Sequence, residues 1–291
     1  MSQPQRIAFI GLGVMGFPMA GHLAQAGHIV QVYNRSPDKA VRWTTSYPGT
    51  ACDTPREAAA GCELIALCVG NDEDIRAVMY GDDGILAGAA AGATIVDHTT
   101  ASAAVAREID AACRQRGLRF LDAPVSGGQV GAENGALTIM VGGEPDAFAQ
   151  AQPLLNHYAR AVTLMGPVGS GQLTKMVNQI AIAGLLQGLS EALAFSEHAG
   201  LDSAQVLDVI CKGAAQSWQM ENRGSTMITN QFDFGFAVEW MRKDLSICLD
   251  EARRNGSRLP VTALVDQFYA QIVARGGKRQ DTSSLIQLLK D

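Results

Sequence analysis

The chain has 291 residues, enough for two domains or one large one. Hydrophobic residues make up 47% and charged residues 18%, as in a globular protein with a sizeable core. The formal net charge of -6 offers no basic surface to nucleic acid, and no apolar run reaches membrane-spanning length. We therefore expect neither a nucleic-acid partner nor a membrane span.

The six cysteines and five histidines show no zinc-site spacing, so no metal site is expected. The residues Met1–Arg6 show no signal-peptide core. Reduced thiols and a cytoplasmic location are the corresponding expectations.

In the first half of the chain, short apolar runs alternate with helical patterns. The predicted strands are Arg6–Gly11, Ile29–Tyr33, Leu64–Val69, Thr94–Asp97 and Arg119–Leu121. The predicted helices between them are Met15–Ala26, Pro37–Thr45, Asp72–Tyr80 and Ala103–Arg116. This strict alternation indicates an α/β fold with a parallel, doubly wound sheet. A further strand pair, Ala136–Val141 and Ala161–Leu164, brackets a helix near Pro145–Tyr158 and would complete the sheet.

After the glycine-rich segment 166–171 only helical patterns follow, so we predict domains at 1–165 and 166–291, the second all-α. Its first helix, Gln172–His198, is long, lies between the domains and carries apolar residues on most faces, so we expect it to be buried all round. Shorter helices are predicted at Ser203–Lys212, Phe236–Asn255, Pro260–Arg275 and Thr282–Lys290. One small helical domain could not bury the long helix alone, which favours a homodimer or homotetramer.

A glycine motif lies between the first predicted strand and the first predicted helix. Its residues are Gly11, Leu12, Gly13, Val14, Met15 and Gly16. In this GxGxxG pattern the first glycine allows a tight turn, the second admits a pyrophosphate, and the third lets the helix pack on the strand. The phosphates would lie at the positive end of the helix. The motif in this context predicts a dinucleotide site.

The end of the second predicted strand indicates which dinucleotide binds. An NAD site usually has an acid there for the ribose hydroxyls, whereas this chain has Asn34, Arg35 and Ser36, with Lys39 behind them. Arginine can hold a 2′-phosphate with two donors, and lysine adds a second charge. NADP(H) is favoured over NAD(H). The alternative is a solvated turn with two incidental cations.

Two further segments suggest the chemistry. Ser126, Gly127 and Gly128 follow a strand and could form a nest of N–H donors for a carboxylate, or a purely structural turn. Lys175 and Asn178 are three residues apart on the long predicted helix, so they share a face, which Gln179 borders. Burial and the positive nicotinamide ring would each lower the pKa of Lys175 toward the range useful in acid–base catalysis. Alternatively, Lys175 extends to solvent and has no role.

Several ordered motifs together resemble the β-hydroxyacid dehydrogenase family, over nearly the whole chain. Beyond the glycine motif with Met19-Ala20, they are Asp122–Gly128, Gly131-Ala132-Glu133, Leu137–Gly143, Gly171-Gln172 through Lys175 to Asn178-Gln179, and Lys243-Asp244-Leu245. The family includes 3-hydroxyisobutyrate, tartronate-semialdehyde and glyoxylate/succinic-semialdehyde reductases. The resemblance implies a Rossmann domain for NADP(H) and a helical domain for substrate and dimerisation, acting on a small carboxylate-bearing hydroxy acid or semialdehyde.

The resemblance also implies residue roles. Lys175 would be the catalytic acid–base; Ser126, Gly127 and Gly128 would hold the substrate carboxylate, and Asn178 would bond the reacting substrate. Lys243 would lie near the nicotinamide, and Val69, Gly70, Thr99 and Thr100 would contact the cofactor. The segment Asp97-His98-Thr99-Thr100 departs from the family's Asp-x-Ser-Thr or Asp-x-Ser-Ser, because Thr99 keeps the hydroxyl but adds a methyl group to the pocket. His98 occupies a variable position of that motif and is not expected to be catalytic.

Two rival interpretations stay open. An imine reductase would share the cofactor fold, but it generally lacks a lysine at the position of Lys175 and has no need for a carboxylate site. A non-catalytic nucleotide-binding module would have lost the catalytic lysine, whereas Lys175, Asn178 and Lys243 are all present here. Gln216-Ser217-Trp218 and Phe236 are candidates for the wall of the substrate pocket.

Overall fold

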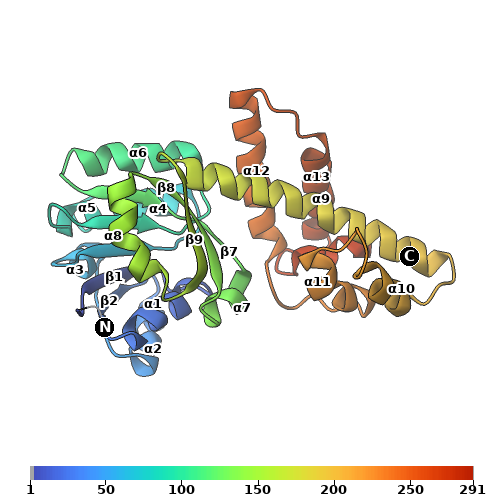
Figure 1. Cartoon of the computed structure of the whole chain (residues 1–291), viewed down its shortest axis with the longest axis horizontal. Coiled ribbons are helices and arrows are strands. Elements are labelled where there is room, and N and C mark those ends of the chain that lie inside the picture. The colour runs from blue at the N-terminus through green and yellow to red at the C-terminus, as the bar shows by residue number, and fades with distance from the viewer. Residues whose placement is uncertain (1–2, 291) are drawn as a thin grey trace. The chain divides into compact units, whose positions relative to one another are not determined.

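The computed structural model describes residues 3–290, and the chain forms two compact units, Met1–Lys175 and Met176–Asp291. The first unit is an α/β sandwich and the second is helical, so the predicted fold class is confirmed (Figure 1). The helix α9 (Ser170–His198) begins in the first unit and continues through the start of the second.

A nine-stranded sheet forms the centre of the first unit, in the order β3-β2-β1-β4-β5-β6-β8-β7, with β9 also paired to β8. Its strands are β1 (Arg6–Ile10), β2 (Ile29–Tyr33), β3 (Thr50–Ala51), β4 (Leu64–Leu67), β5 (Thr94–Asp97), β6 (Arg119–Asp122), β7 (Val125–Ser126), β8 (Leu137–Gly143) and β9 (Ala159–Gly166). The strands β1 to β6 are parallel, in the order typical of dinucleotide-binding sheets.

The strand β8 runs antiparallel to β6 and β7, a departure from the expected all-parallel sheet. The cause lies in the short β7 and the helix α7 (Gly128–Glu133), neither of which the sequence patterns predicted. The chain leaves β6, turns through these two elements and returns as β8, which pairs with both β6 and β7. A short return of this kind allows an antiparallel pairing without a long crossover.

Two apolar layers cover the sheet because alternate strand residues point to opposite faces. In β1, Ile7 and Phe9 join one layer while Ala8 and Ile10 join the other. The first layer packs with α1 (Gly16–Gln25), α2 (Pro37–Ser46), α7 and α8 (Pro145–Leu155). The second packs with α3 (Pro55–Ala59), α4 (Asp72–Met79), α5 (Ile85–Gly88) and α6 (Ala103–Arg114). The carboxyl ends of the parallel strands are thereby left as the edge where a ligand can bind.

The second unit packs its helices around α9 in two apolar clusters. These helices are α10 (Ser203–Ile210), α11 (Trp218–Ile228), α12 (Val238–Asn255), α13 (Pro260–Ala274) and a final 3₁₀ helix, η1 (Thr282–Leu288). The last segment was expected as an α-helix, and α11 was not predicted. Within residues 3–290, no helix combines the length and hydropathy needed to span a membrane.

The expectation that the long helix is buried all round is wrong for the single chain. Val177, Leu185 and Phe195 are 66%, 45% and 72% exposed, and helical periodicity places them within one face. Small or apolar exposed residues lie between them on that face, namely Ala181, Gly188 and Ala192. Val177, Leu185 and Phe195 therefore form an apolar stripe along α9 that the rest of the chain does not cover.

Candidate active site

The glycine motif forms the turn from β1 into α1. Gly11 has a φ of +94°, and a side chain on it would collide with the Cys68 carbonyl after β4. A side chain on Gly16 would collide with the Gly11 carbonyl, so the helix could not approach the strand. No atom lies within 4 Å of where a Cβ would stand on Gly13, which leaves that backbone open to a phosphate. The turn thus fits a dinucleotide.

The segment after β2 supports this turn and carries exposed cations. The Asn34 amide oxygen accepts a hydrogen bond from the Leu12 backbone at 2.8 Å, and its amide nitrogen donates to the Ser36 carbonyl at 3.0 Å. Asn34 therefore stabilises the glycine turn directly. Arg35 and Lys39 are both exposed, and Arg35 pairs with Asp74 of α4 at 2.8 Å. Two exposed cations thus follow the end of β2.

The loops after β4 and β5 are bonded to each other. The Thr99 hydroxyl accepts from the Val69 backbone at 3.0 Å, and the Thr99 backbone donates to the Asp97 carboxylate at 2.8 Å. The Thr99 hydroxyl, which replaces the family's serine hydroxyl in the Asp97–Thr100 motif, therefore joins these two loops at the carboxyl edge of the sheet. Gly70 and Thr100, also expected at the cofactor, are half-buried beside these residues.

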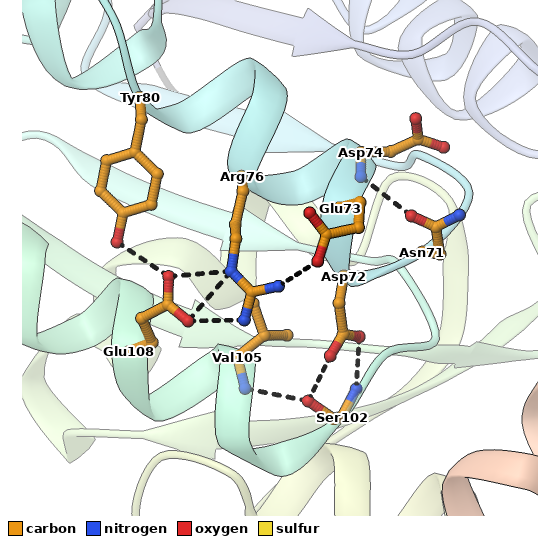
Figure 2. Close-up of polar contacts among 9 residues, drawn as sticks. All are labelled: Asn71, Asp72, Glu73, Asp74, Arg76, Tyr80, Ser102, Val105 and Glu108. Carbon is orange, nitrogen blue, oxygen red and sulfur yellow. Dashed lines mark hydrogen bonds and ion pairs between the residues drawn. The ribbon is translucent and has the colours of Figure 1, made fainter.

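The polar network in Figure 2 also joins the segments that follow β4 and β5. The Asp72 carboxylate accepts from the Ser102 backbone at 2.9 Å and from its hydroxyl at 2.5 Å. Arg76 of α4 bonds Glu108 of α6, which Tyr80 also contacts (Figure 2). These contacts hold α4 against α6, so the two loops at their N-terminal ends have a defined spacing.

The predicted carboxylate-binding segment begins in β7. Ser126 is half-buried, Gly127 and Gly128 are exposed, and both glycines have positive φ, +131° and +62°. Residues with a side chain rarely adopt these angles, so the glycines permit this turn into α7. The segment presents a hydroxyl and bare backbone at the carboxyl edge of the sheet.

Lys175 lies in the second turn of α9 and is only 7% exposed, so the alternative of a lysine extending to solvent does not describe this structure. The first turn of α9 is bonded to the sheet. The Asp122 carboxylate accepts from the backbone of Gly169 at 2.7 Å and of Gln172 at 2.8 Å. The Gln172 side chain in turn donates to the Thr99 carbonyl at 2.7 Å and accepts from the Ala101 backbone at 3.0 Å.

In the second unit, the other expected polar residues also lie together. Asn178 donates to the Gln179 side chain at 2.7 Å, and Gln179 donates to the buried Asp244 at 2.7 Å. Lys243 forms an ion pair with Asp244 at 3.2 Å. A chain of contacts thus joins α9 to α12, and Gln179 and Asp244 orient Asn178 and Lys243.

Burial perturbs two acids at the ends of β5 and β6. Asp97 and Asp122 are register partners on the neighbouring strands, 1% and 0% exposed. Burial raises the pKa of Asp97 to about 7 and that of Asp122 to about 6, although backbone N–H donors oppose the rise in both. Both residues lie in sequence motifs, but no role was predicted for them. The signal that could have identified them is an acid at the end of each of two buried neighbouring strands.

His98 is buried and held on both ring nitrogens. Nδ1 lies 2.7 Å from the Ala123 carbonyl and Nε2 lies 2.9 Å from the Tyr158 hydroxyl. A carbonyl can only accept, so Nδ1 carries the proton and Nε2 accepts from Tyr158. Burial lowers the pKa of His98 to about 4. The imidazole is therefore neutral, and both of its nitrogens are engaged in hydrogen bonds. Among the described residues, no group of three or more His, Cys, Asp or Glu side chains could hold a metal.

Comparison with known proteins agrees with this architecture. The family described as the NAD binding domain of 6-phosphogluconate dehydrogenase matches residues 6–166. The family described as NAD-binding of NADP-dependent 3-hydroxyisobutyrate dehydrogenase matches residues 169–289. Together the two matches cover both units, from the first strand to the last helix.

Individual relatives align over the full length. An uncharacterized oxidoreductase of Shewanella frigidimarina is 61% identical over 98% of both chains. The 2-hydroxy-3-oxopropionate reductase of Escherichia coli is 35% identical over 98% of this chain and 97% of its own. The solved structure of Mycobacterium tuberculosis 3-hydroxyisobutyrate dehydrogenase with L-serine is 29% identical, with a TM-score of 0.91 over 99% of this chain and 100% of that one.

The fold and the site define an NAD(P)-dependent oxidoreductase. The chain belongs to the β-hydroxyacid dehydrogenase family, among the 3-hydroxyisobutyrate dehydrogenase-like proteins, and is an NAD(P)-dependent hydroxyacid dehydrogenase.

Proposed function

We propose that this chain transfers hydride between NADP(H) and a small 3-hydroxy acid or its semialdehyde, with Lys175 as the general acid–base. The observation that carries the proposal is the position of Lys175. It is buried, one helical turn beyond Gln172, whose backbone is bonded to Asp122. Asp122 ends the strand that leads directly into Ser126, Gly127 and Gly128. The lysine and the carboxylate-binding segment thus share one rigid support.

Each residue then has a defined task. The hydroxyl of Ser126 and the backbone of Gly127 and Gly128 bind the substrate carboxylate and orient a short acid. The Lys175 ammonium donates a proton to the carbonyl oxygen during reduction and, as the neutral amine, takes the hydroxyl proton during oxidation. Asn178, one turn further along the same helix, bonds that oxygen. Lys243 lies near the nicotinamide, and Val69, Gly70, Thr99 and Thr100 contact the cofactor. When bound, the nicotinamide supplies or accepts the hydride.

The cofactor choice rests on charge. Arg35 and Lys39 are exposed after β2, and no acid occupies the end of that strand, where it would repel a 2′-phosphate. Gly11, Leu12, Gly13, Val14, Met15 and Gly16 would hold the pyrophosphate, and Asn34 and Ser36 shape the turn beside it. Each charge-assisted phosphate bond contributes about 1.5–3 kcal/mol, so NADP(H) is preferred over NAD(H) by one to two orders of magnitude. The matched family of NADP-dependent dehydrogenases supports this choice.

The proposal extends to the protein's setting. We place the enzyme in the cytoplasm, as a homodimer or homotetramer whose subunits meet along the apolar stripe of α9. The nucleotide-binding domain is assigned to 1–165 and the substrate and dimerisation domain to 166–291.

The test is a screen of short semialdehydes and 3-hydroxy acids with NADPH and NADH, followed by cofactor absorbance. Each active semialdehyde is paired with its methyl ester, which keeps the aldehyde and removes the charge. We expect kcat/KM for the ester to be lower by about one to two orders of magnitude, because a charge-assisted contact is lost. Equal values for acid and ester would refute carboxylate recognition, and uniform inactivity with all substrates would refute the assigned reaction.

A further inference from the structure

The carboxylate of Asp122 lies where three parts of the first unit meet. Asp122 is the last residue of β6 and is 0% exposed. One of its oxygens accepts from Gly169 at 2.7 Å, and the other accepts from Gln172 at 2.8 Å. In the sheet, Asp122 is the register partner of Gly142 on the neighbouring strand β8. One side chain therefore connects the substrate segment's strand to the start of α9.

Glycines surround this carboxylate closely. A Cβ on Gly142 would collide with one Asp122 oxygen, and a Cβ on Gly171 would lie 2.8 Å from the other. Real side chains do not approach so closely, so backbone alone can enclose the group at these distances. A displacement of the first turn of α9 would break hydrogen bonds on one side or create clashes on the other. The helix start is thus held tightly in its present position.

A second connection holds the same turn from a different direction. Gln172 bonds both Thr99 and Ala101 in the loop after β5, at 2.7 and 3.0 Å. The first turn of α9 is therefore bonded to two neighbouring loops at the carboxyl edge of the sheet. Lys175 follows one turn later, about 4.5 Å further along the helix axis.

We propose that Asp122 is a positioning residue for the reaction, one that sets the place of Lys175 relative to Ser126, Gly127 and Gly128. The inference rests on the proposed function, since it assigns Lys175 the proton transfer. Asp122 touches neither substrate nor cofactor; it acts through the backbone of α9. A displacement of about 1 Å at a reacting group can lower turnover by about 10²-fold. Loss of one of the two helix contacts is therefore expected to lower kcat.

The test is a double-mutant cycle with Asp122→Asn and Lys175→Ala in the full-length protein. Asparagine keeps the shape but presents an NH₂ group to one of the two backbone N–H donors. We expect Asp122→Asn to lower kcat by about 10- to 100-fold in the parent. In the Lys175→Ala background it should lower kcat by less than about threefold, because the group being positioned is gone. NADPH affinity should stay within about twofold throughout.

Asp202→Asn is the matched control. Asp202 caps α10 by accepting from two backbone N–H groups, at 2.9 and 3.2 Å, but α10 carries no residue of the site. This variant should leave kcat unchanged. If Asp122→Asn does not fold, Asp122→Ser replaces it, because the smaller side chain removes both contacts to the helix without adding bulk among the glycines.

The outcomes separate the two claims. An equal fold-loss from Asp122→Asn in both backgrounds would overturn the positioning role, as would a failure of both Asp122 variants to fold, which would make Asp122 a stability residue. Full turnover in Lys175→Ala would instead refute the proposed function, whatever Asp122 does.

Discussion

Acidification should destabilise this protein because the buried His98 side chain resists protonation. Replacing His98 should remove that part of the pH dependence of stability. The imidazole is neutral, 1% exposed, and bonded to Ala123 and Tyr158. Burial lowers its pKa from 6.5 to about 4, so the folded state resists protonation while the unfolded chain accepts it. The stabilising contribution is therefore complete above pH 6.5 and is lost as the pH falls toward 4. At 1.36 kcal/mol per pH unit, the loss over this range is about 3 kcal/mol.

The assay is urea unfolding of the parent and of His98→Asn at several pH values between 7.5 and about 4. Asparagine can still donate to the Ala123 carbonyl but does not titrate. The variant starts less stable at neutral pH, because the Tyr158 hydroxyl loses its acceptor, yet its unfolding free energy should fall by about 3 kcal/mol less over the same range. His28 and His157, with pKa values lowered by burial, and Asp97 and Asp122, with pKa values raised by burial, also titrate, but they contribute equally to both proteins. Parallel pH curves for the two proteins would refute the reasoning.

Three further outcomes are expected. Arg35→Ala should reduce the preference for NADPH over NADH, measured as the ratio of kcat/KM values, by about one order of magnitude, because Lys39 remains; equal values in the parent would rule out the cofactor assignment. Light scattering at micromolar concentration should show a dimer or a dimer of dimers, because Val177, Leu185 and Phe195 leave an apolar stripe uncovered; a stable monomer would contradict that expectation. His98→Ala should keep kcat within a few-fold, and loss of activity in a folded variant would return His98 to the list of candidate bases.

Much of the fold could be predicted because the strand, helix and turn signals in the sequence agreed with one another. The strands Ile29–Tyr33 and Thr94–Asp97 have the bounds that the sequence predicts, since each is short, rich in β-branched residues and followed by polar residues. Short elements such as β7 and α7 were missed because two or six residues carry no measurable periodicity. The antiparallel return of β8 depends on those elements and could not be inferred without them.

The site was partly predictable. The glycine motif, Ser126–Gly128 and Lys175 were predicted as site residues from residue type, spacing and the family resemblance. The contacts that support them could not be predicted, because they join residues far apart in the chain. Asp122 bonds a turn 50 residues away, and Gln172 reaches 73 residues back to Thr99. Likewise His28 and His157 are far apart in the sequence, but their Nε2 atoms lie 3.2 Å from each other.

The most direct test of the account is the turnover of Lys175→Ala with NADPH and the best semialdehyde from the screen. A positioned acid–base group contributes about 10²–10⁴-fold, so kcat should fall by that factor while NADPH affinity stays near the parent value. Lys175→Arg should recover little, because guanidinium stays protonated and cannot act as a base. Turnover close to the parent's in Lys175→Ala would contradict the assignment of Lys175 as the proton-transfer residue.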